Sequence, residues 1–174
     1  MYKKLRENSF DNIGLVFQAY MKRSEDDIKS LIDYKPSIRL CKGIYKEPPE
    51  IAYQDKQEIR ENYKKLFKLI VENGMYIGIA THDEELIQYA LEYITKNNLG
   101  TQQYEFQMLL GVREKRRDEL LALGHRLRVY VPFGEDWYGY ATRRLKENPD
   151  MAYIIAKAIS VSYTHLTLPT IYSV

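Results

Sequence analysis

The feature that most constrains the fold of this chain is a regular alternation between short apolar stretches and longer stretches with helical spacing of apolar residues. The alternation repeats five times without the turn signal of an antiparallel hairpin. A strand–helix–strand unit returns the chain in the same direction, so the strands pair in parallel and the helices cover the sheet. The sequence therefore predicts an α/β fold, with strands at residues 12–20, 38–43, 75–80, 104–109 and 127–131.

Local signals place helices between these strands. Residues 54–73 carry an apolar stripe and stop before Gly74, which is typical of a helix that ends. Ser24 to Asp27 have the spacing of a capping box and predict that a helix begins there. The first strand is almost continuously apolar, and we expect it to be a buried parallel strand. The predicted stripe consists of Ile59, Tyr63, Leu66, Phe67 and Ile70.

The length of the chain narrows the choice of architecture. Its 174 residues amount to one domain. Units of roughly 25 to 35 residues suit a (β/α)8 barrel, but a complete barrel needs about 250 residues. Five units cannot close a barrel. The residues alone leave two architectures open, an open α/β sheet and a part of a TIM-type barrel.

Composition excludes several classes of protein. The 26 basic and 24 acidic residues nearly cancel, so no nucleic-acid surface is expected. The single cysteine, Cys41, excludes a disulfide framework and fits a reducing compartment. The sequence has no apolar run of about 18 residues, and its N-terminus lacks the apolar core of a signal peptide. We therefore expect a soluble, cytoplasmic chain.

The last stretch of the chain differs from the rest. Residues 161–174, VSYTHLTLPTIYSV, are rich in threonine and have no periodicity of a strand or helix. The peptide VSYTHLTLPT resembles the translation of a transposase sequencing adapter, and it is left out of functional reasoning. The sequence predicts residues 1–160 as the functional part and residues 161–174 as a non-native, disordered tail.

Candidate site residues come from the ends of the predicted strands, because the active site of a parallel barrel lies at the carboxyl ends of its strands. The last predicted helix adds Arg143 and Arg144, which share a helix face with Tyr140. Arginine can bind both oxygens of a carboxylate, although an isolated arginine pair is most often a solvated helix face. The strand-end rule indicates Gln18, Tyr20, residues 42–45, Thr81, His82, residues 107–110 and Tyr130.

Four motifs occur in the same order as in one enzyme family. They are IRLCKGIYKEPPE at 38–50, IATHD at 79–83, YEFQMLLGV at 104–112 and YVPFGEDWYGYATRRL at 130–145. Over about residues 12–159 the chain resembles proline dehydrogenase, the FAD enzyme that oxidises L-proline. The resemblance implies a distorted (β/α)8 barrel, of which residues 1–160 form roughly strands 4 to 8 with their helices. Strands 1 to 3 are then absent, and we expect the fragment alone to be inactive.

The resemblance also implies a reaction and the residues that carry it. L-Proline is oxidised to Δ1-pyrroline-5-carboxylate by hydride transfer to FAD, and a membrane quinone takes the electrons through peripheral contact at the inner face of the membrane. Arg39 stabilises negative charge on the reduced flavin. No catalytic acid or base and no metal ligands are implied. The implied substrate-binding residues are Tyr45, Leu109, Tyr130, Tyr140, Arg143 and Arg144. The implied cofactor-binding residues are Gln18, Arg39, Lys42, His82 and Glu147.

Several alternatives stay open. Ile44 replaces a small residue of the family motif and Leu110 replaces an aromatic residue or histidine, so the preference for proline over a hydroxylated analogue is undecided. One competing hypothesis is a non-catalytic or misfolded fragment that binds partners through an open sheet edge. Another is a different flavin-dependent barrel oxidoreductase, which predicts a glycine-rich phosphate loop after the last strands. Only Gly134 and Gly139 are present there.

Overall fold

The computed structural model describes residues 1–43, 45 and 47–131. Within this part, strands and helices alternate as the sequence predicts, and no helix is both long enough and apolar enough to cross a bilayer. The tail predicted for residues 161–174 lies outside the described residues and stays a prediction. The elements are α1 (Tyr2–Glu7), β1 (Gly14–Gln18), α2 (Ser24–Lys29), the 3-10 helix η1 (Ile32–Tyr34), β2 (Ser37–Cys41), α3 (Lys56–Glu72), β3 (Ile77–Ala80), α4 (Glu84–Lys96), β4 (Tyr104–Leu109), α5 (Glu114–Ala122) and β5 (Leu127–Tyr130).

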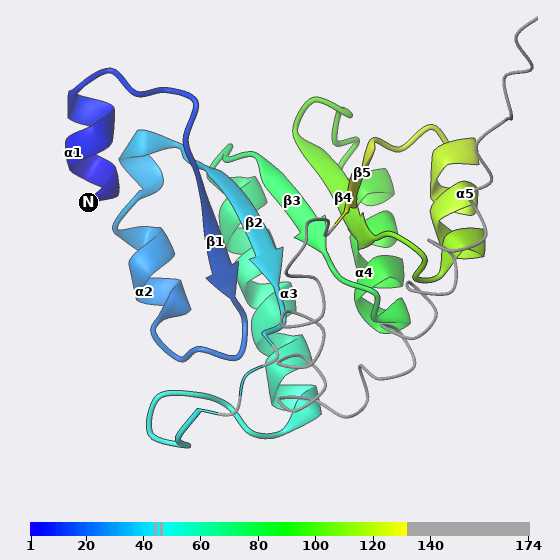
Figure 1. Ribbon diagram of the computed structural model, residues 1–174, viewed down its shortest axis with the longest axis horizontal. Coiled ribbons are helices and arrows are strands. Elements are labelled where there is room, and N and C mark those ends of the chain that lie inside the picture. Colours follow the sequence, from blue (N-terminus) through cyan, green and yellow to red (C-terminus); the bar gives the residue numbers. More distant parts are fainter. Residues whose placement is uncertain (44, 46, 132–174) are drawn as a thin grey trace, which may run out of the picture.

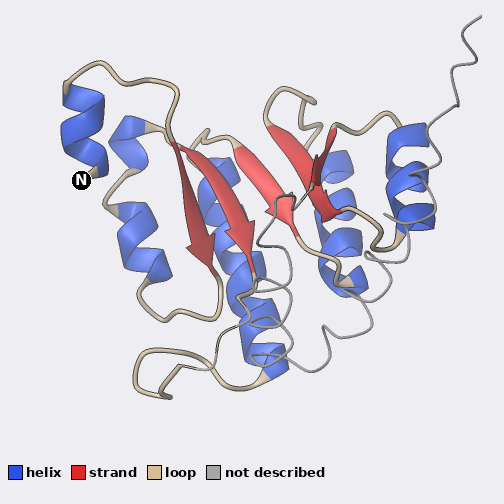
Figure 2. Ribbon diagram, in the orientation of Figure 1, coloured by secondary structure: helices blue, strands red, loops and turns tan. Residues whose placement is uncertain are grey.

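The described strands form one parallel sheet in the order β1-β2-β3-β4-β5. Each strand pairs with the next in sequence, without the reversal of strand order that marks a doubly wound sheet. Because crossovers between parallel strands are right-handed, crossovers that proceed in one direction place their helices on the same face. Figure 1 shows α3 and α4 behind the sheet, and Figure 2 shows the strands and these helices as two layers.

The hydrophobic core lies between the sheet and these helices. The predicted stripe of α3 packs into it, with Ile59 partly buried and the other four residues buried. On α4, Leu86, Ala90 and Ile94 are buried as predicted, together with Ile87. Burying one large apolar side chain stabilises a fold by about 1.5–3 kcal/mol, so this face of the sheet holds the fold together. The strand residues that are fully buried include Ile38, Leu40, Ile77, Ile79 and Phe106.

An aspartate begins each of the two long helices. The side chain of Asp55 accepts hydrogen bonds from the backbone N–H groups of Gln57 and Glu58, and Asp83 accepts one from the N–H of Glu85. These N–H groups have no partner within the helix, so the carboxylates stabilise the first turns of α3 and α4. Asp83 also lies at the carboxyl end of the sheet, where it takes part in the candidate site.

Two predictions for the first quarter of the chain are wrong. Ser24 is not a helix cap: its hydroxyl donates to the carbonyl oxygen of Gln18 at 2.7 Å and so ties α2 to the end of β1. β1 is not a buried strand, since it is an edge of the described sheet and Val16 is 60% exposed. An apolar sequence shows that a strand can be buried, but only the neighbouring elements decide whether it is.

Gly43, in the connection after β2, occupies a conformation and a space that suit only glycine. Its φ is +98°, and an added Cβ atom would lie 2.2 Å from Cδ1 of Tyr20, whose ring is buried. We expect Gly43→Ala to lower the free energy of unfolding by about 2–4 kcal/mol, because backbone strain and overpacking act together. Urea unfolding followed by circular dichroism measures this loss.

Gly124 provides the matched control for this substitution. Its φ is +84°, but an added Cβ atom would meet no atom within 4 Å. Gly124→Ala should therefore cost only the backbone strain, about 1–2 kcal/mol. Equal losses in the two variants would contradict a contribution from the contact with Tyr20.

Candidate functional site

Polar side chains gather on the face of the sheet opposite the core, which we call the inner face. Register partners in a parallel sheet share a face, and so do residues two positions apart along a strand. The core residues Ile38 and Leu40 mark one face, so Arg39 between them faces the other way. By the register of the strands, the inner face includes Val16, Gln18, Arg39, Gly78, Glu105, Gln107, Leu109, Arg128 and Tyr130.

Four of the predicted substrate- and cofactor-binding residues lie on this face, as does Gln107, which the strand-end rule indicated. Gln18, Leu109 and Tyr130 are the last residues of β1, β4 and β5, and Arg39 lies two residues before the end of β2. Leu109 and Tyr130 are direct register partners, so the two predicted pocket-wall residues are neighbours. The structure thus brings these four residues to one face of the sheet, three of them at its carboxyl end, while their roles stay predictions.

A chain of hydrogen bonds crosses the inner face from β2 to β5. Arg39 donates from Nη1 to Oε1 of Gln107, and Nε2 of Gln107 donates to Oε1 of Glu105 at 2.7 Å. Arg128 forms an ion pair with Glu105, with 2.7 Å between Nε and Oε1. Glu105 is only 4% exposed, and a buried carboxylate is tolerated only with such partners. Two guanidinium groups and one carboxylate leave this network with a net charge of +1.

Lys42 is held at the rim of the same end of the sheet. Its Nζ lies 2.7 Å from Oδ2 of Asp83, and Nε of Arg60 lies 2.9 Å from the same oxygen. Burial alone raises the pKa of Asp83, but the hydrogen bonds and charges of Lys42 and Arg60 outweigh it and hold the pKa below its ordinary value. The side chain of Asp83 is 6% exposed and that of Lys42 is 39% exposed. The arrangement fixes one cationic side chain where a ligand above the strand ends can reach it.

His82 is a neutral hydrogen-bond acceptor in this structure. The backbone N–H of Leu109 donates to its Nε2 at 3.0 Å, so the ring proton is on Nδ1. Burial, reinforced by the positive charges of Arg113, Arg39 and Lys42, lowers the pKa of His82 to about 4. His82 therefore ties the end of β3 to the end of β4 as an uncharged side chain. The ring is therefore neutral at neutral pH in this structure.

The protonation state of His82 gives a testable dependence on pH. Because its pKa in the folded chain lies below the ordinary value of about 6.5, the unfolded chain binds more protons between these values. The stabilisation is complete above about pH 6.5 and is lost as the pH falls toward 4, by about 1–3 kcal/mol for a partly exposed ring. Chemical denaturation at several pH values measures this loss. His82→Gln should flatten it, and a ring that titrates near pH 6.5 by NMR would contradict the assignment.

The other residues to consider lie in the connection after β2, at the end of β2 or outside the described part. Tyr45, in the connection after β2, is 38% exposed. The thiol of Cys41 donates to the carbonyl oxygen of Phe17 at 3.5 Å, and burial raises its pKa, so it is not an activated nucleophile. The predicted residues outside the described part are Tyr140, Arg143, Arg144 and Glu147.

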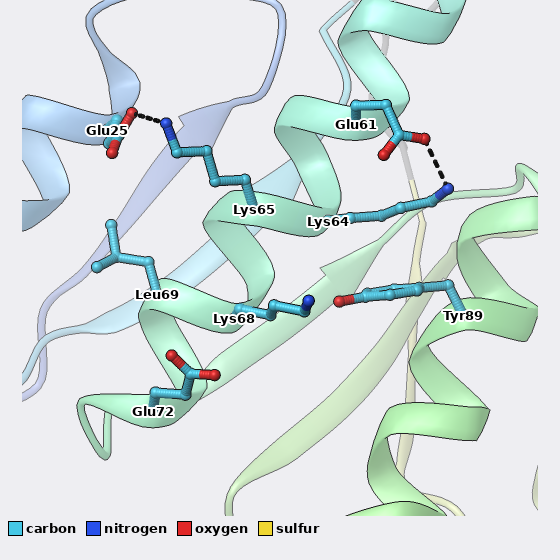
Figure 3. A pocket seen from close by; sticks show the side chains of 8 residues that line it. All are labelled: Glu25, Glu61, Lys64, Lys65, Lys68, Leu69, Glu72 and Tyr89. Carbon is cyan, nitrogen blue, oxygen red and sulfur yellow. Dashed lines mark hydrogen bonds and ion pairs between the residues drawn. The ribbon is translucent and has the colours of Figure 1, made fainter.

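A second concave surface is lined by residues of the helices alone. It has a volume of about 540 Å³ and is formed by α2, α3 and α4 (Figure 3). Its charges are largely paired with one another: Lys65 lies 2.5 Å from Glu25, and Lys64 lies 2.9 Å from Glu61. Such a surface of mutually neutralised charges is typical of solvated helix grooves, and the candidate site remains at the inner face.

The sequence did not indicate several residues that organise the site. Glu105 does have a signal, because it alternates with core residues in Tyr-Glu-Phe-Gln-Met-Leu at 104–109 and so shares a face with Gln107. Asp83 was inside a motif and Gly78 directly precedes that motif, but neither had distinguishing chemistry. Arg60 lies on α3 and meets Asp83 only through tertiary packing. No local pattern could have identified that pair.

The chain was compared with known proteins. A family model described as "Proline dehydrogenase" matches residues 1–156. "Proline dehydrogenase 1" of Bacillus subtilis subsp. natto is 40% identical over 159 residues, which is 91% of this chain and 52% of that protein. "Proline dehydrogenase" of Deinococcus radiodurans is 40% identical over 149 residues, 86% of this chain and 48% of that protein. This chain thus spans about half the length of the curated relatives it matches.

Solved structures show the same likeness in three dimensions. One is the crystal structure of proline utilization A (PutA) from Bdellovibrio bacteriovorus, a protein inactivated by N-propargylglycine. It superposes on this chain with a TM-score of 0.73. The superposition covers 82% of this chain and 17% of that chain, at 30% sequence identity.

Proposed function

Since this chain belongs to the proline dehydrogenase family, we propose that it forms part of an enzyme that oxidises L-proline to Δ1-pyrroline-5-carboxylate with FAD as hydride acceptor. The observation that carries the proposal is that Gln18, Arg39, Leu109 and Tyr130 share the inner face of the sheet, three of them at the carboxyl ends of their strands. They come from four different strands, as site residues of a barrel enzyme do. Cationic and amide groups beside an apolar wall suit a small zwitterion and a polar aromatic cofactor.

The described strands would supply five strands of a (β/α)8 barrel, roughly strands 4 to 8. The consecutive parallel order without reversal supports this, since a barrel is wound in one direction only. The exposure of the inner face also supports the assignment to part of a barrel. Val16 is 60% exposed and the side chain of Arg128 is 67% exposed, and the other strands of a closed barrel would cover this face. Residues 1–160 would then be the carboxyl-terminal part of the barrel.

The substrate would lie at the strand ends. Converting L-proline to the imine removes a hydride from Cδ, the carbon next to nitrogen that does not carry the carboxylate. It also removes a proton from the nitrogen. Leu109 and Tyr130, as adjacent residues, would wall the pyrrolidine ring, with Tyr45 and Tyr140 beside them. Arg143 and Arg144 would bind the carboxylate through charge-assisted hydrogen bonds and fix the ring carbon for transfer.

The donor groups of the inner face fit FAD, which supplies the hydride-accepting ring when bound. Gln18 offers an amide donor and acceptor, and Arg39 offers N–H donors and a positive charge; both match the carbonyl and ring nitrogen atoms of an isoalloxazine. In the described part, the guanidinium of Arg39 donates only to Gln107, so its other N–H groups can serve a ligand. Arg39 would stabilise the negative charge of the reduced ring. Lys42 would lie near the phosphates of the cofactor, and His82 and Glu147 would be further cofactor-binding residues.

The proposal extends to the electron acceptor on the family resemblance alone. The electrons would pass to a membrane quinone, through peripheral contact of a cytoplasmic enzyme with the inner face of the membrane.

Flavin binding tests the proposed function directly. The purified chain is examined for bound flavin by its visible absorbance, and L-proline is then added with a dye acceptor. The same measurement is made on a chimaera in which the part of the Bacillus subtilis relative that this chain does not match completes the barrel. We expect flavin and proline-dependent bleaching in the chimaera and neither in the chain alone.

Each other outcome has a distinct meaning. Flavin that L-proline bleaches in the chain alone would show that five strands suffice and that the fragment is not inactive. Flavin that L-proline does not bleach in the chimaera would favour another flavin-dependent barrel oxidoreductase. A chimaera that folds but retains no flavin would overturn the proposed function.

A further inference from the structure

We infer that Gln107 is a positioning residue for Arg39, fixed by Glu105 and given its space by Gly78. The inference rests on the proposed function, in which Arg39 contacts the flavin ring. The supporting observation is that three neighbouring strands place Arg39 (β2), Gly78 (β3) and Glu105 (β4) in one row of register partners. Gln107 follows Glu105 by two residues and therefore points to the same face.

Gly78 is the position that lets the side chain of Gln107 cross β3. An added Cβ atom on Gly78 would lie 2.5 Å from Nε2 of Gln107 and 3.0 Å from its Cδ. The amide of Gln107 thus occupies the space that a side chain of Gly78 would fill. No positive φ requires glycine at this position, so its absence of a side chain is explained by the amide that lies over it. From there the amide oxygen reaches the guanidinium of Arg39, two strands away from β4.

The two partners of the amide fix its orientation. The oxygen accepts from the cation Arg39, and the NH2 group donates to the carboxylate of Glu105 at 2.7 Å. A primary amide presents an acceptor and a donor on adjacent atoms, so it satisfies both partners at once. Glu105 is nine-tenths buried, which makes it a rigid anchor for this amide.

The amide also keeps the charges of the network apart. Glu105 forms its ion pair with Arg128, at 2.7 Å, and meets Arg39 only through the neutral amide. Among the described residues, Arg39 is therefore held in place without a carboxylate at its own guanidinium. A positively charged group that is fixed but not neutralised is what stabilises charge developing on a neighbouring ring.

The experiment is a double-mutant cycle of Gln107→Ala, Gly78→Ala and the double variant, made in the flavin-loaded chimaera described above. We expect each single variant to slow the reduction of flavin by L-proline about 10-fold, because a hydrogen bond to a charged group is lost. The flavin reduction potential should become more negative in each. In the double variant the rate should equal that of Gln107→Ala, because the methyl group added at position 78 would then displace no amide. Gln88→Ala, an exposed glutamine on α4, is the matched control and should change neither quantity.

A second readout needs no flavin. In the chain itself, the guanidinium of Arg39 should give separate NMR signals for its two Nη groups, because the bond to Gln107 hinders rotation. These signals should merge in Gln107→Ala, while unfolding curves confirm that the variant remains folded. If Gly78→Ala does not fold, Gln107→Ala alone decides the role of Gln107.

The outcomes separate this inference from the proposed function. An unchanged potential, rate and Arg39 spectrum in Gln107→Ala would overturn the inference even in a working enzyme. A protein that binds no flavin would overturn the proposed function, and the NMR signals would still decide whether Gln107 fixes Arg39. Equal slowing by Gly78→Ala in the presence and absence of Gln107 would refute the role of Gly78.

Discussion

In the flavin-loaded chimaera, Arg39→Met is expected to slow the reduction of bound flavin by L-proline about 100-fold, the usual loss when one preorganised donor to a developing charge is removed. Arg39 supplies the net positive charge of the inner-face network, because Arg128 and Glu105 neutralise each other. Methionine has similar length and no charge, so it removes the electrostatic contribution with little change in packing. Stopped-flow measurement of flavin bleaching, together with the reduction potential, tests this expectation.

Arg39→Lys separates charge from geometry in the same experiment. Lysine keeps the charge but has no planar fork with which to contact Gln107 and a ligand together. Its rate should fall between those of the wild type and Arg39→Met. A potential that is the same in all three proteins would show that Arg39 does not face the flavin. Unfolding measurements should differ little, because the side chain is not part of the core.

Asp83→Ala is expected to lower the free energy of unfolding by about 3–4 kcal/mol. The substitution removes the cap of α4, worth about 1 kcal/mol, and leaves two cations beside a nearly buried position. Lys42 and Arg60 are 39% and 29% exposed, and this solvent access reduces the cost of losing their partner. Urea unfolding at neutral pH measures the change. Because Lys42 would no longer be held in place, the variant should also bind the proposed cofactor FAD more weakly, through its phosphates.

Two further variants divide this cost into its parts. Asp83→Asn retains the cap and loses the charge, so its loss should be smaller than that of Asp83→Ala. Asp55→Ala removes the cap of α3, where the aspartate is exposed, and should cost about 1 kcal/mol. The depressed pKa of Asp83 means that its stabilisation is present above about pH 4 and is lost as the pH falls through the folded value. Equal losses for Asp83→Ala and Asp55→Ala would contradict a contribution from the ion pairs.

Most of the fold can be predicted from the sequence because its signals are local. The stripe of α3 and the alternation of β4 follow directly from the geometry of a helix and a strand, and they identify the core. The strand ends near Gln18, Leu109 and Tyr130 were predictable for the same reason. Ser24 shows the limit of local signals. A capping sequence was present, but Arg23 is the N-cap residue, and Ser24 is already in the helix with its hydroxyl donating to the carbonyl group of Gln18.

For the candidate site, too, local signals were predictable and tertiary contacts were not. The sequence by itself determined which residue types lie at the strand ends, and its ordered motifs determined the family. Only the tertiary structure decided that Gly78 leaves space for the amide of Gln107, that this amide joins Arg39 to Glu105, and that Asp83 pairs with Lys42. Glu105 and Arg39 are far apart in sequence and meet because parallel pairing sets residues of three strands in one row. Such contacts depend on the register of the strands and on the space between side chains, and a local pattern of residues predicts neither.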